Sequence, residues 1–480
     1  MDPVDRVRGF LPPTTRNMEG RLSVLNSKIE AVEHRLAEVE MALIDIRRLI
    51  EEHGIAYSEI ARISDSTFAC LGEVSKQIDS LAKAQRYSNV EYVRLLGLPA
   101  DKEQILVVGW YGAENLGDEL MLKTLLGYFN EEMLLRTTVL LWDCEDYPRF
   151  ELDHRVRTIH YPKSTWDLES LADAYDVIVW GGGAIIDEGQ FTSDPGNINT
   201  GNIFIRLNEL ALARKKRVYC LGLSSNRSFK DFEYAARLRE VVDKAEIFSV
   251  RDPYSAESLK RLGVSSDAIV ECQDIVFANN SILRLREKRK SCAPRDYYKL
   301  GIVLFFTEGR LHEYIRVVEE IRAVVEKLKP SYEIALIPFL NEGGIDAYLY
   351  GQVLKGISSG GSTRIAEYSE EGILNELADC DFCICYKYHA ALVANLLGVR
   401  SLNVCYDEHP HYYNKMKNLA DVFQYQSHLV SSRDFEGNVA ETLTDAMLDT
   451  RKPCVGDTFI DNCIEWIRGV CVEIGKDELL

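Results

Sequence analysis

Apolar residues recur with a helical period near the start of the chain. Between residues 22 and 50, leucine, isoleucine and valine alternate in steps of three and four without interruption. This spacing, kept over about four heptads, is typical of a coiled coil. The a positions are Leu22, Ile29, Leu36, Leu43 and Ile50, and the d positions are Leu25, Val32, Val39 and Ile46. Because three of the four d positions are β-branched, the pattern favours three or four strands over two.

The pattern therefore predicts an oligomerisation region. A flexible lead over residues 1–17 precedes it, the coiled-coil or helical region covers 18–88, and a linker covers 89–102. We expect a homo-oligomer that assembles through residues 18–88. The alternative is an amphipathic helix that packs onto the chain's own globular part.

From residue 104 the hydrophobic pattern changes to short apolar runs that alternate with helical segments. The predicted strands of a first domain, residues 103–285, are 104–108, 138–142, 176–180, 217–221, 246–250 and 269–272, and its helices are 118–129, 168–174, 200–214, 230–243 and 253–262. This rhythm is typical of a parallel sheet covered on both faces. The charged stretch 283–296 is interpreted as a hinge.

The same rhythm resumes in a second domain, residues 296–480. Its predicted strands are 299–305, 332–338, 363–367, 381–385 and 400–405, with helices at 311–328, 345–357, 371–379 and 389–397, and further C-terminal helices at 437–448 and 457–472. The fold class is therefore α/β, with two tandem Rossmann-like domains in a GT-B-like arrangement. We expect a ligand between the carboxyl ends of the two sheets.

Composition narrows the possible partners. The net charge of −19 disfavours nucleic-acid binding, which needs clustered lysine and arginine. No apolar run approaches the length of a transmembrane helix, and the N-terminus lacks the apolar core of a signal peptide. Twelve cysteines without a signal peptide indicate a reducing, cytoplasmic location. Cys380, Cys383 and Cys385 lie in a predicted buried strand, so we expect core thiols and no metal site.

Glycine-rich and polar segments follow several predicted strands. Asn115 and Asp118 lie in a glycine-containing loop after the first strand, which does not match the dinucleotide-binding fingerprint. We predict that Asp118 and Glu119 open the next helix, and a simple helix cap is an equal interpretation of Asp118. Gly181, Gly182 and Gly183, followed by Asp187, can present backbone N–H groups to an anion or form only a turn.

Cationic residues follow the later strands. Arg251 ends a strand, with Ser255 in the next helical turn, and it can bind a carboxylate or phosphate or simply pair with Asp252 on the surface. Lys387 and His389 follow another strand end, where a histidine can shuttle protons near neutral pH. Tyr406 and Lys415 come after the last predicted strand.

In order and spacing, these motifs resemble the polysaccharide pyruvyl transferase family over about residues 104–425. The matching segments are Gly109–Gly112, Asn115–Glu119, Asp176 with Gly181–Gly183 and Asp187, Ser249–Asp252 with Ser255, Asp274 with Phe277, and Lys387–Ala390 with Gly398, Tyr406 and Lys415. One departure is Lys387, where the family usually has arginine. Lysine keeps the charge and loses the bidentate fork.

The resemblance implies a ketal-forming transferase that needs no cofactor. Phosphoenolpyruvate, the co-substrate, would donate its three-carbon unit to a sugar of a bacterial-type surface polysaccharide or its precursor. Arg251 and Lys387 would hold the donor, and His389 would protonate it. The other strand-end residues would bind substrate, namely Asn115, Asp118, Gly181, Gly182, Gly183, Asp187, Ser255, Tyr406 and Lys415. Two alternatives remain, a GT-B glycosyltransferase that uses a nucleotide sugar and a non-catalytic oligomeric scaffold in glycan assembly.

Overall fold

The structure is a computed structural model that describes the greater part of the chain from residue 102. The described residues are 98, 102–142, 152–193, 198–225, 229–290, 296–306, 309–340, 345–357, 362–406 and 410–476. The predicted lead, the coiled-coil region and nearly all of the linker lie outside these residues, so the predicted homo-oligomer remains a prediction.

The first domain contains a parallel sheet of eight strands. They are β1 Ile105–Val108, β2 Thr137–Leu141, β3 Arg157–His160, β4 Val177–Trp180, β5 Gly183–Ile186, β6 Arg217–Ser225, β7 Ile247–Val250 and β8 Val270–Glu271. Their order is β3-β2-β1-β4-β6-β7-β8, with β5 paired to β6. The six predicted strands are confirmed. The prediction missed β3, which is polar and half-exposed, and β5, which begins inside the glycine run.

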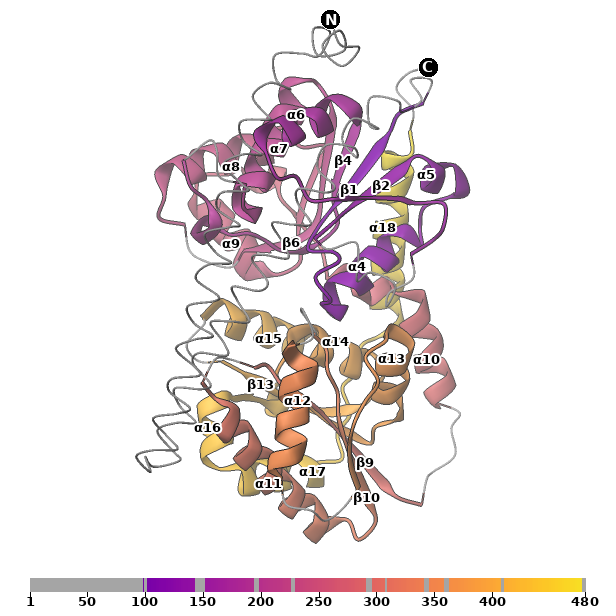
Figure 1. Cartoon of the computed structure of the whole chain (residues 1–480), viewed down its shortest axis with the longest axis vertical. Coiled ribbons are helices and arrows are strands. Elements are labelled where there is room, and N and C mark those ends of the chain that lie inside the picture. The colour runs from indigo at the N-terminus through magenta and orange to yellow at the C-terminus, as the bar shows by residue number, and fades with distance from the viewer. Residues whose placement is uncertain are drawn as a thin grey trace, which may run out of the picture. The chain divides into compact units, whose positions relative to one another are not determined.

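Helices cover both faces of this sheet (Figure 1). They are α4 Leu116–Leu126, α5 Glu131–Leu135, α6 Thr165–Ala174, α7 Thr200–Ala213, α8 Phe232–Lys244 and α9 Pro253–Arg261, with short 3₁₀ turns η2 Glu188–Gln190, η3 Ser266–Ala268 and η4 Ile275–Ala278. Side-chain caps start most of them. Ser164, Asp231 and Asp252, for example, each accept a hydrogen bond from a first-turn N–H group.

The charged stretch predicted as a hinge is largely a helix, α10 Asn280–Lys290. This helix was not predicted, because the charged residues hide an apolar side in the sequence. Ile282 is fully buried, and Leu283 and Leu285 pack against the main hydrophobic core. The basic residues gather at the C-terminal end, where positive charge stabilises a helix.

The second domain contains a six-stranded parallel sheet of order β11-β10-β9-β12-β13-β14. Its strands are β9 Tyr298–Val303, β10 Tyr332–Leu336, β11 Ser362–Ile365, β12 Phe382–Cys385, β13 Arg400–Cys405 and β14 Leu429–Ser431. Its helices are α11 Leu311–Leu328, α12 Ile345–Gly356, α13 Glu370–Asp379, α14 Tyr388–Leu396, α15 Pro410–Val422, α16 Ser432–Gly437, α17 Val439–Leu448 and α18 Asp457–Ile474, with the 3₁₀ turn η6 Gln426–His428. The five predicted strands are confirmed, whereas β14, α15 and α16 were not predicted.

In both sheets the strand order reverses beside the first strand. Strands β1 and β4 are neighbours in the first sheet, and β9 and β12 are neighbours in the second. Ligands of such folds bind beyond the carboxyl ends of the strands at this reversal. These ends of the two sheets are in contact, because Leu116 N donates to Phe339 O at 3.1 Å and Asn115 forms a backbone bridge with Leu340.

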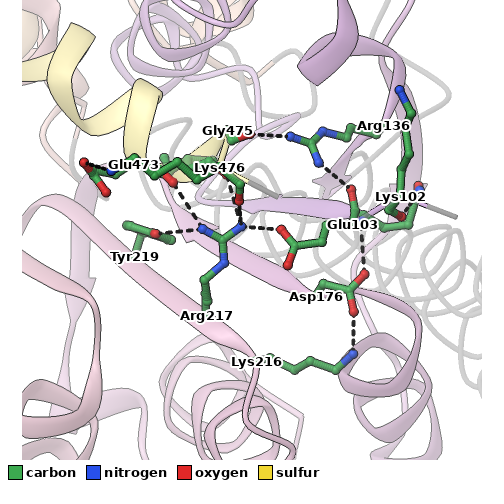
Figure 2. A network of polar contacts seen from close by, with 12 residues as sticks. Lys102, Glu103, Arg136, Asp176, Lys216, Arg217, Tyr219, Glu473, Gly475 and Lys476 are labelled. Atoms are coloured by element: carbon green, nitrogen blue, oxygen red, sulfur yellow. Dashed lines mark hydrogen bonds and ion pairs between the residues drawn. The ribbon is translucent and has the colours of Figure 1, made fainter. Parts of the chain in front are cut away.

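The C-terminal helix α18 returns to the first domain. Figure 2 shows Arg217 at the amino end of β6 donating to the carbonyls of Glu473 (3.1 Å) and Lys476 (2.6 Å). Arg217 also pairs with Glu103, and Arg136 donates to the carbonyl of Gly475 at 3.0 Å. Cationic side chains at a helix C-terminus satisfy its free carbonyls and oppose its dipole.

The near ends of helices α10 and α18 approach each other in Figure 1. Arg286 of α10 donates to the carbonyl of Val455 at 3.2 Å and lies 3.3 Å from the carboxylate of Asp457 at the start of α18. The two chain segments that connect the domains are therefore bonded to each other.

We expect the variant Arg217→Met to lose about 3–5 kcal/mol of unfolding free energy, because it removes one charge of the buried ion pair between Arg217 and Glu103. Urea unfolding followed by fluorescence measures this loss, and limited proteolysis shows whether α18 is released first. The matched control is Arg214→Met, which removes an ion pair with the exposed Asp173 and should cost at most about 1 kcal/mol. Equal losses in the two variants would contradict the prediction.

Two further observations concern only the described residues. None of their helices is long and apolar enough to cross a membrane. All cysteines among them are free, and Cys380, Cys383 and Cys385 are fully buried in and beside β12, as predicted for core thiols.

Candidate active site

An arginine, an aspartate and a histidine meet where the carboxyl ends of the two sheets are in contact. Nη1 of Arg251 donates to Oδ2 of Asp274 at 2.6 Å and lies 3.2 Å from Nε2 of His389. The same histidine nitrogen lies 3.3 Å from Oδ2 of Asp274. We refer to these three residues as the Arg251 cluster. Nε2 of His389 thus faces both a donor and an acceptor, so it can hold or release a proton there.

Each member of the cluster follows a strand. Arg251 comes directly after β7, and Asp274 precedes η4 and accepts a hydrogen bond from Val276 N at 3.0 Å. His389 lies in the first turn of α14, after β12 of the second sheet. The cluster is therefore assembled from both domains. The predicted alternative for Arg251, a surface pair with Asp252, is wrong, because Arg251 is 4% exposed and pairs with Asp274.

The guanidinium of Arg251 is fixed on several sides. Nη2 donates to Oγ of Ser224 at 3.2 Å, and the guanidinium carbon lies 4.8 Å from the ring centroid of Tyr388. Nε is buried and has no hydrogen-bond partner in the described part of the chain. A buried donor without a partner costs about 1–3 kcal/mol, and such groups gather at functional sites.

Opposing charges set the protonation of this cluster. Burial alone would raise the pKa of Asp274, but the charge of Arg251 and the hydrogen bond from His389 outweigh burial and hold it well below its usual range. Burial alone would lower the pKa of Arg251, and the charge of Asp274 raises it. The cluster thus keeps an ionised arginine–aspartate pair beside the histidine.

Asp118 and Lys415 lie close enough to this cluster to sense its charge. Burial raises the pKa of Asp118 to about 6, although the charges of His389 and Arg251 oppose the rise. Burial and the charge of Arg251 lower the pKa of Lys415 to about 7, against the effect of Asp252. Both groups can therefore exchange protons near neutral pH.

The glycine-containing loop after β1 holds Asp118 in place. Asn115 is the N-cap of α4, and its Nδ2 donates to Oδ2 of Asp118 at 2.6 Å. Asp118 and Glu119 lie in the first turn of this helix, as predicted, and the alternative that Asp118 is the cap is wrong, since the cap is Asn115. Glu119 accepts a hydrogen bond from Gly112 N at 2.7 Å and so fixes the loop.

The three glycines after β4 form bare backbone beside Asp118. Gly182 and Gly183 have φ values of 104° and 100°, which side chains rarely adopt. A Cβ atom on Gly183 would lie 3.4 Å from Oδ1 of Asp118, and one on Gly182 would lie 2.7 Å from Sδ of Met121. The N–H of Gly181 already donates to Val108 O at 3.0 Å, so it is not a donor for an anion.

Ser255 and Asp187 were predicted to bind substrate. The hydroxyl of Ser255 donates to Oδ2 of Asp252 and accepts a hydrogen bond from Ser225 N, each at 2.8 Å. These contacts hold α9 against the end of β6. Asp187 caps η2 by accepting a hydrogen bond from Gly189 N at 2.9 Å.

Lys387 and Tyr406 make contacts within the second domain. Nζ of Lys387 lies 3.9 Å from Oδ2 of Asp346 and 5.1 Å from the ring centroid of Phe305. Oη of Tyr406 donates to the carbonyl of Phe305 at 2.9 Å and lies 2.6 Å from Oη of Tyr314. Arg251, His389, Asp118 and Lys415 thus lie close enough to influence one another electrostatically. The contacts of Lys387 given above are instead with Asp346 and Phe305.

Comparison with known proteins identifies the family. The family model for polysaccharide pyruvyl transferase matches residues 115–408, which is more than half of the chain. The chain belongs to the polysaccharide pyruvyl transferase family. Membership supports a transferase with a role in polysaccharide modification. No curated protein matches the chain significantly.

Several solved structures are similar to this pyruvyl transferase family member. UDP-GlcNAc 2-epimerase from Neisseria meningitidis, bound to UDP-GlcNAc, has a TM-score of 0.52 at 13% identity, covering 77% of this chain and 100% of the epimerase. The epimerase from Methanocaldococcus jannaschii gives 0.50 at 11% identity, with the same coverage. Anabaena HepE in complex with UDP and glucose gives 0.44 at 12% identity, covering 78% and 97%. The two epimerases support the predicted GT-B-like pair of Rossmann-like domains.

Asp274 and Ser224 were not among the predicted site residues of this family member. Asp274 did carry a signal, since it follows a predicted strand and belongs to the family pattern. Its role as partner of Arg251 became visible only when η4 placed the two side chains together. Ser224 lies inside the long strand β6, where no sequence signal distinguishes it.

We expect Gly117→Ala to destabilise this pyruvyl transferase family member by about 1–3 kcal/mol, because the added Cβ would lie 1.9 Å from Nδ1 of His389. The substitution forces α4 away from α14 or displaces the imidazole. The matched control is Gly351→Ala in α12, where nothing lies within 4 Å of the added atom and alanine favours the helix. Chemical denaturation compares the two variants, and a Gly117→Ala protein as stable as the wild type would contradict this contact.

Proposed function

We propose that the chain transfers the three-carbon unit of phosphoenolpyruvate to two hydroxyls of a sugar, in a bacterial-type surface polysaccharide or its precursor, with release of phosphate. Membership of the polysaccharide pyruvyl transferase family supports this reaction. The observation that carries it is the Arg251 cluster, in which a buried arginine and a histidine from opposite domains lie 3.2 Å apart.

The donor needs cations, because it carries a carboxylate and a phosphate. In this proposal Arg251 binds one of the two groups, and its buried Nε supplies a donor that has no partner in the described part of the chain. Lys415, which is 5% exposed, adds a second positive charge while it is protonated. Lys387 extends the positive charge on the second domain, next to Asp346.

The reaction needs one proton donor and one proton acceptor. His389 gives a proton to the methylene carbon of the donor, which becomes a methyl group, and the neighbouring carbon becomes electrophilic. A sugar hydroxyl adds to that carbon, and Asp118 takes the hydroxyl proton. A second hydroxyl then displaces phosphate as the C–O bond to it breaks, and the leaving phosphate takes up the proton of that hydroxyl, so one diol and one donor give one ketal and one hydrogen phosphate. A positioned acid or base contributes about 10²–10⁴-fold in rate.

The acceptor approaches from the first domain in this proposal. Asn115 orients the carboxylate of Asp118, and the backbone of Gly183 lies beside it without a side chain. We also propose that the reaction takes place in the cytoplasm, and that residues 18–88 assemble the enzyme into a homo-oligomer.

The pH dependence follows from the two shifted groups. Asp118 accepts a proton only when it is ionised, above its pKa of about 6, and Lys415 is positively charged only below its pKa of about 7. We therefore expect kcat/KM for phosphoenolpyruvate to be highest between about pH 6 and 7 and to fall on both sides. In Lys415→Arg, which stays charged, the fall on the alkaline side should move to higher pH. An unchanged profile would remove Lys415 from the proposal.

Ligand-induced thermal shift of the full chain provides the main test. Phosphoenolpyruvate should raise the unfolding temperature, because a ligand that binds only the folded state stabilises it. UDP-sugars and GDP-sugars serve as competing ligands. Stabilisation by a nucleotide sugar and none by phosphoenolpyruvate would favour a GT-B glycosyltransferase, and stabilisation by neither would favour a non-catalytic scaffold.

A further inference from the structure

Three aromatic side chains from neighbouring strand ends stack in a row at the carboxyl edge of the first sheet. Trp110 follows β1, Trp142 follows β2 and Tyr161 follows β3. The ring centroids of Trp110 and Trp142 are 4.5 Å apart with a tilt of 44°, and those of Trp142 and Tyr161 are 4.3 Å apart and nearly parallel at 16°. We name these three residues the aromatic row.

The backbone holds the aromatic row in place. The hydroxyl of Tyr161 donates to the carbonyl of Gly109, and Trp142 N donates to Tyr111 O at 2.8 Å. Tyr161 is buried, whereas Trp110 and Trp142 are only partly buried. The row is therefore fixed at its inner end and partly open at its outer end, with little side-chain freedom left to lose when a ligand binds.

Packing alone does not explain this arrangement. The indole N–H of Trp142 is enclosed and has no hydrogen-bond partner in the described part of the chain, although a buried tryptophan usually finds one. Trp110 is only partly buried and lies beside strand ends, where ligands of this fold bind.

The aromatic row adjoins the residue proposed as the proton acceptor. Burial, and after it the charge of Asp118, raises the pKa of Tyr161 against its hydrogen bond to Gly109. Tyr111, in the same loop as Trp110, also senses the charge of Asp118. Asp118 in turn senses His389 and Arg251. Tyr111 and Asp118 also lie near each other in space, because a Cβ atom on Gly181 would lie 2.2 Å from Oη of Tyr111 and one on Gly183 would lie 3.4 Å from Oδ1 of Asp118.

We infer that the aromatic row is a sugar-binding subsite, where a pyranose ring of the acceptor stacks on Trp110 and presents its hydroxyls to Asp118. A pyranose ring has a face of C–H groups that packs on an aromatic ring, while its hydroxyls remain at the rim for hydrogen bonds. The inference rests on the proposed function for its reaction, and its binding can be measured without the donor.

The test uses the full chain and three simple probes: methyl β-D-glucopyranoside, methyl β-D-galactopyranoside and methyl α-D-mannopyranoside. Saturation-transfer NMR titrations to concentrations on the order of 10 mM detect the weak binding expected for a single ring. At least one probe should bind, Trp110→Ala should weaken it about tenfold, and Trp110→Phe should retain most of it. The matched control is Trp166→Ala, which removes a tryptophan that is 39% exposed on α6.

Two results would overturn the inference. One is that none of the three probes binds the wild-type chain, and the other is that Trp110→Ala, with an unchanged unfolding temperature, binds as the wild type does. If Trp110→Ala has a lower unfolding temperature than the wild type, the variant Trp142→Phe is tested in its place. This variant keeps an aromatic ring but loses the indole N–H, and it must alter glycoside binding. If the glycosides bind but phosphoenolpyruvate gives no thermal shift, the result supports the inferred sugar-binding subsite and refutes the proposed transfer reaction.

Discussion

Phosphate release from phosphoenolpyruvate is expected to fall by about 10²–10⁴-fold when His389 is replaced by alanine, because this residue is the proposed proton donor. The substitution removes an imidazole that lies 3.2 Å from Nη1 of Arg251 and 3.3 Å from Oδ2 of Asp274. The ionised arginine–aspartate pair at 2.6 Å stays in place, so donor binding should be weakened less than turnover.

A second histidine provides a matched control for this experiment. His312 is also the second residue of a helix, α11, but it is exposed. The variant His312→Ala should keep wild-type turnover. Phosphate release at the wild-type rate in His389→Ala would show that another group protonates the donor.

Replacing Arg251 by methionine is expected to abolish the thermal shift by phosphoenolpyruvate and to lower the unfolding free energy by about 3–5 kcal/mol. The second effect arises because the fully buried carboxylate of Asp274 would lose its cationic partner. Thermal shift measures donor binding, and urea denaturation measures stability.

A double variant separates these two effects. In Arg251→Met with Asp274→Leu, neither charge remains to be buried, so stability should recover while donor binding stays absent. Arg251→Lys keeps the charge but loses the two parallel donors, and it should bind the donor weakly. Donor binding by the double variant would show that Arg251 is a structural residue only.

The tandem α/β architecture could be predicted from the sequence, because buried parallel strands are continuous apolar runs. The predicted segments 176–180 and 381–385 are examples, because they contain the fully buried central strands β4 and β12. Edge strands such as β3 and β14 could not be predicted in this way. Strand β3 carries Arg157 and His160 and is half-exposed, so its pattern resembles that of a loop.

The approach of Arg251 and His389 was also predicted from their positions at strand ends. What the sequence could not provide was the partner of each charge. Arg251 pairs with Asp274, 23 residues away, and not with its neighbour Asp252, which caps α9. Lys387 lies against Asp346 of α12, a contact that depends on how α12 packs over the second sheet.

The two bonded connections, α10 and α18, have a mechanical consequence. Arg286 of α10 is bonded to the start of α18, and Arg217 is bonded to the end of α18. We expect these hydrogen bonds to resist sliding and twisting of the two domains against each other. The motion that we expect to remain is a hinge rotation of one domain against the other about an axis along these two segments. Under the proposed function, the backbone bridge between Asn115 and Leu340, which also joins the two domains, has to open for a glycan to enter between them.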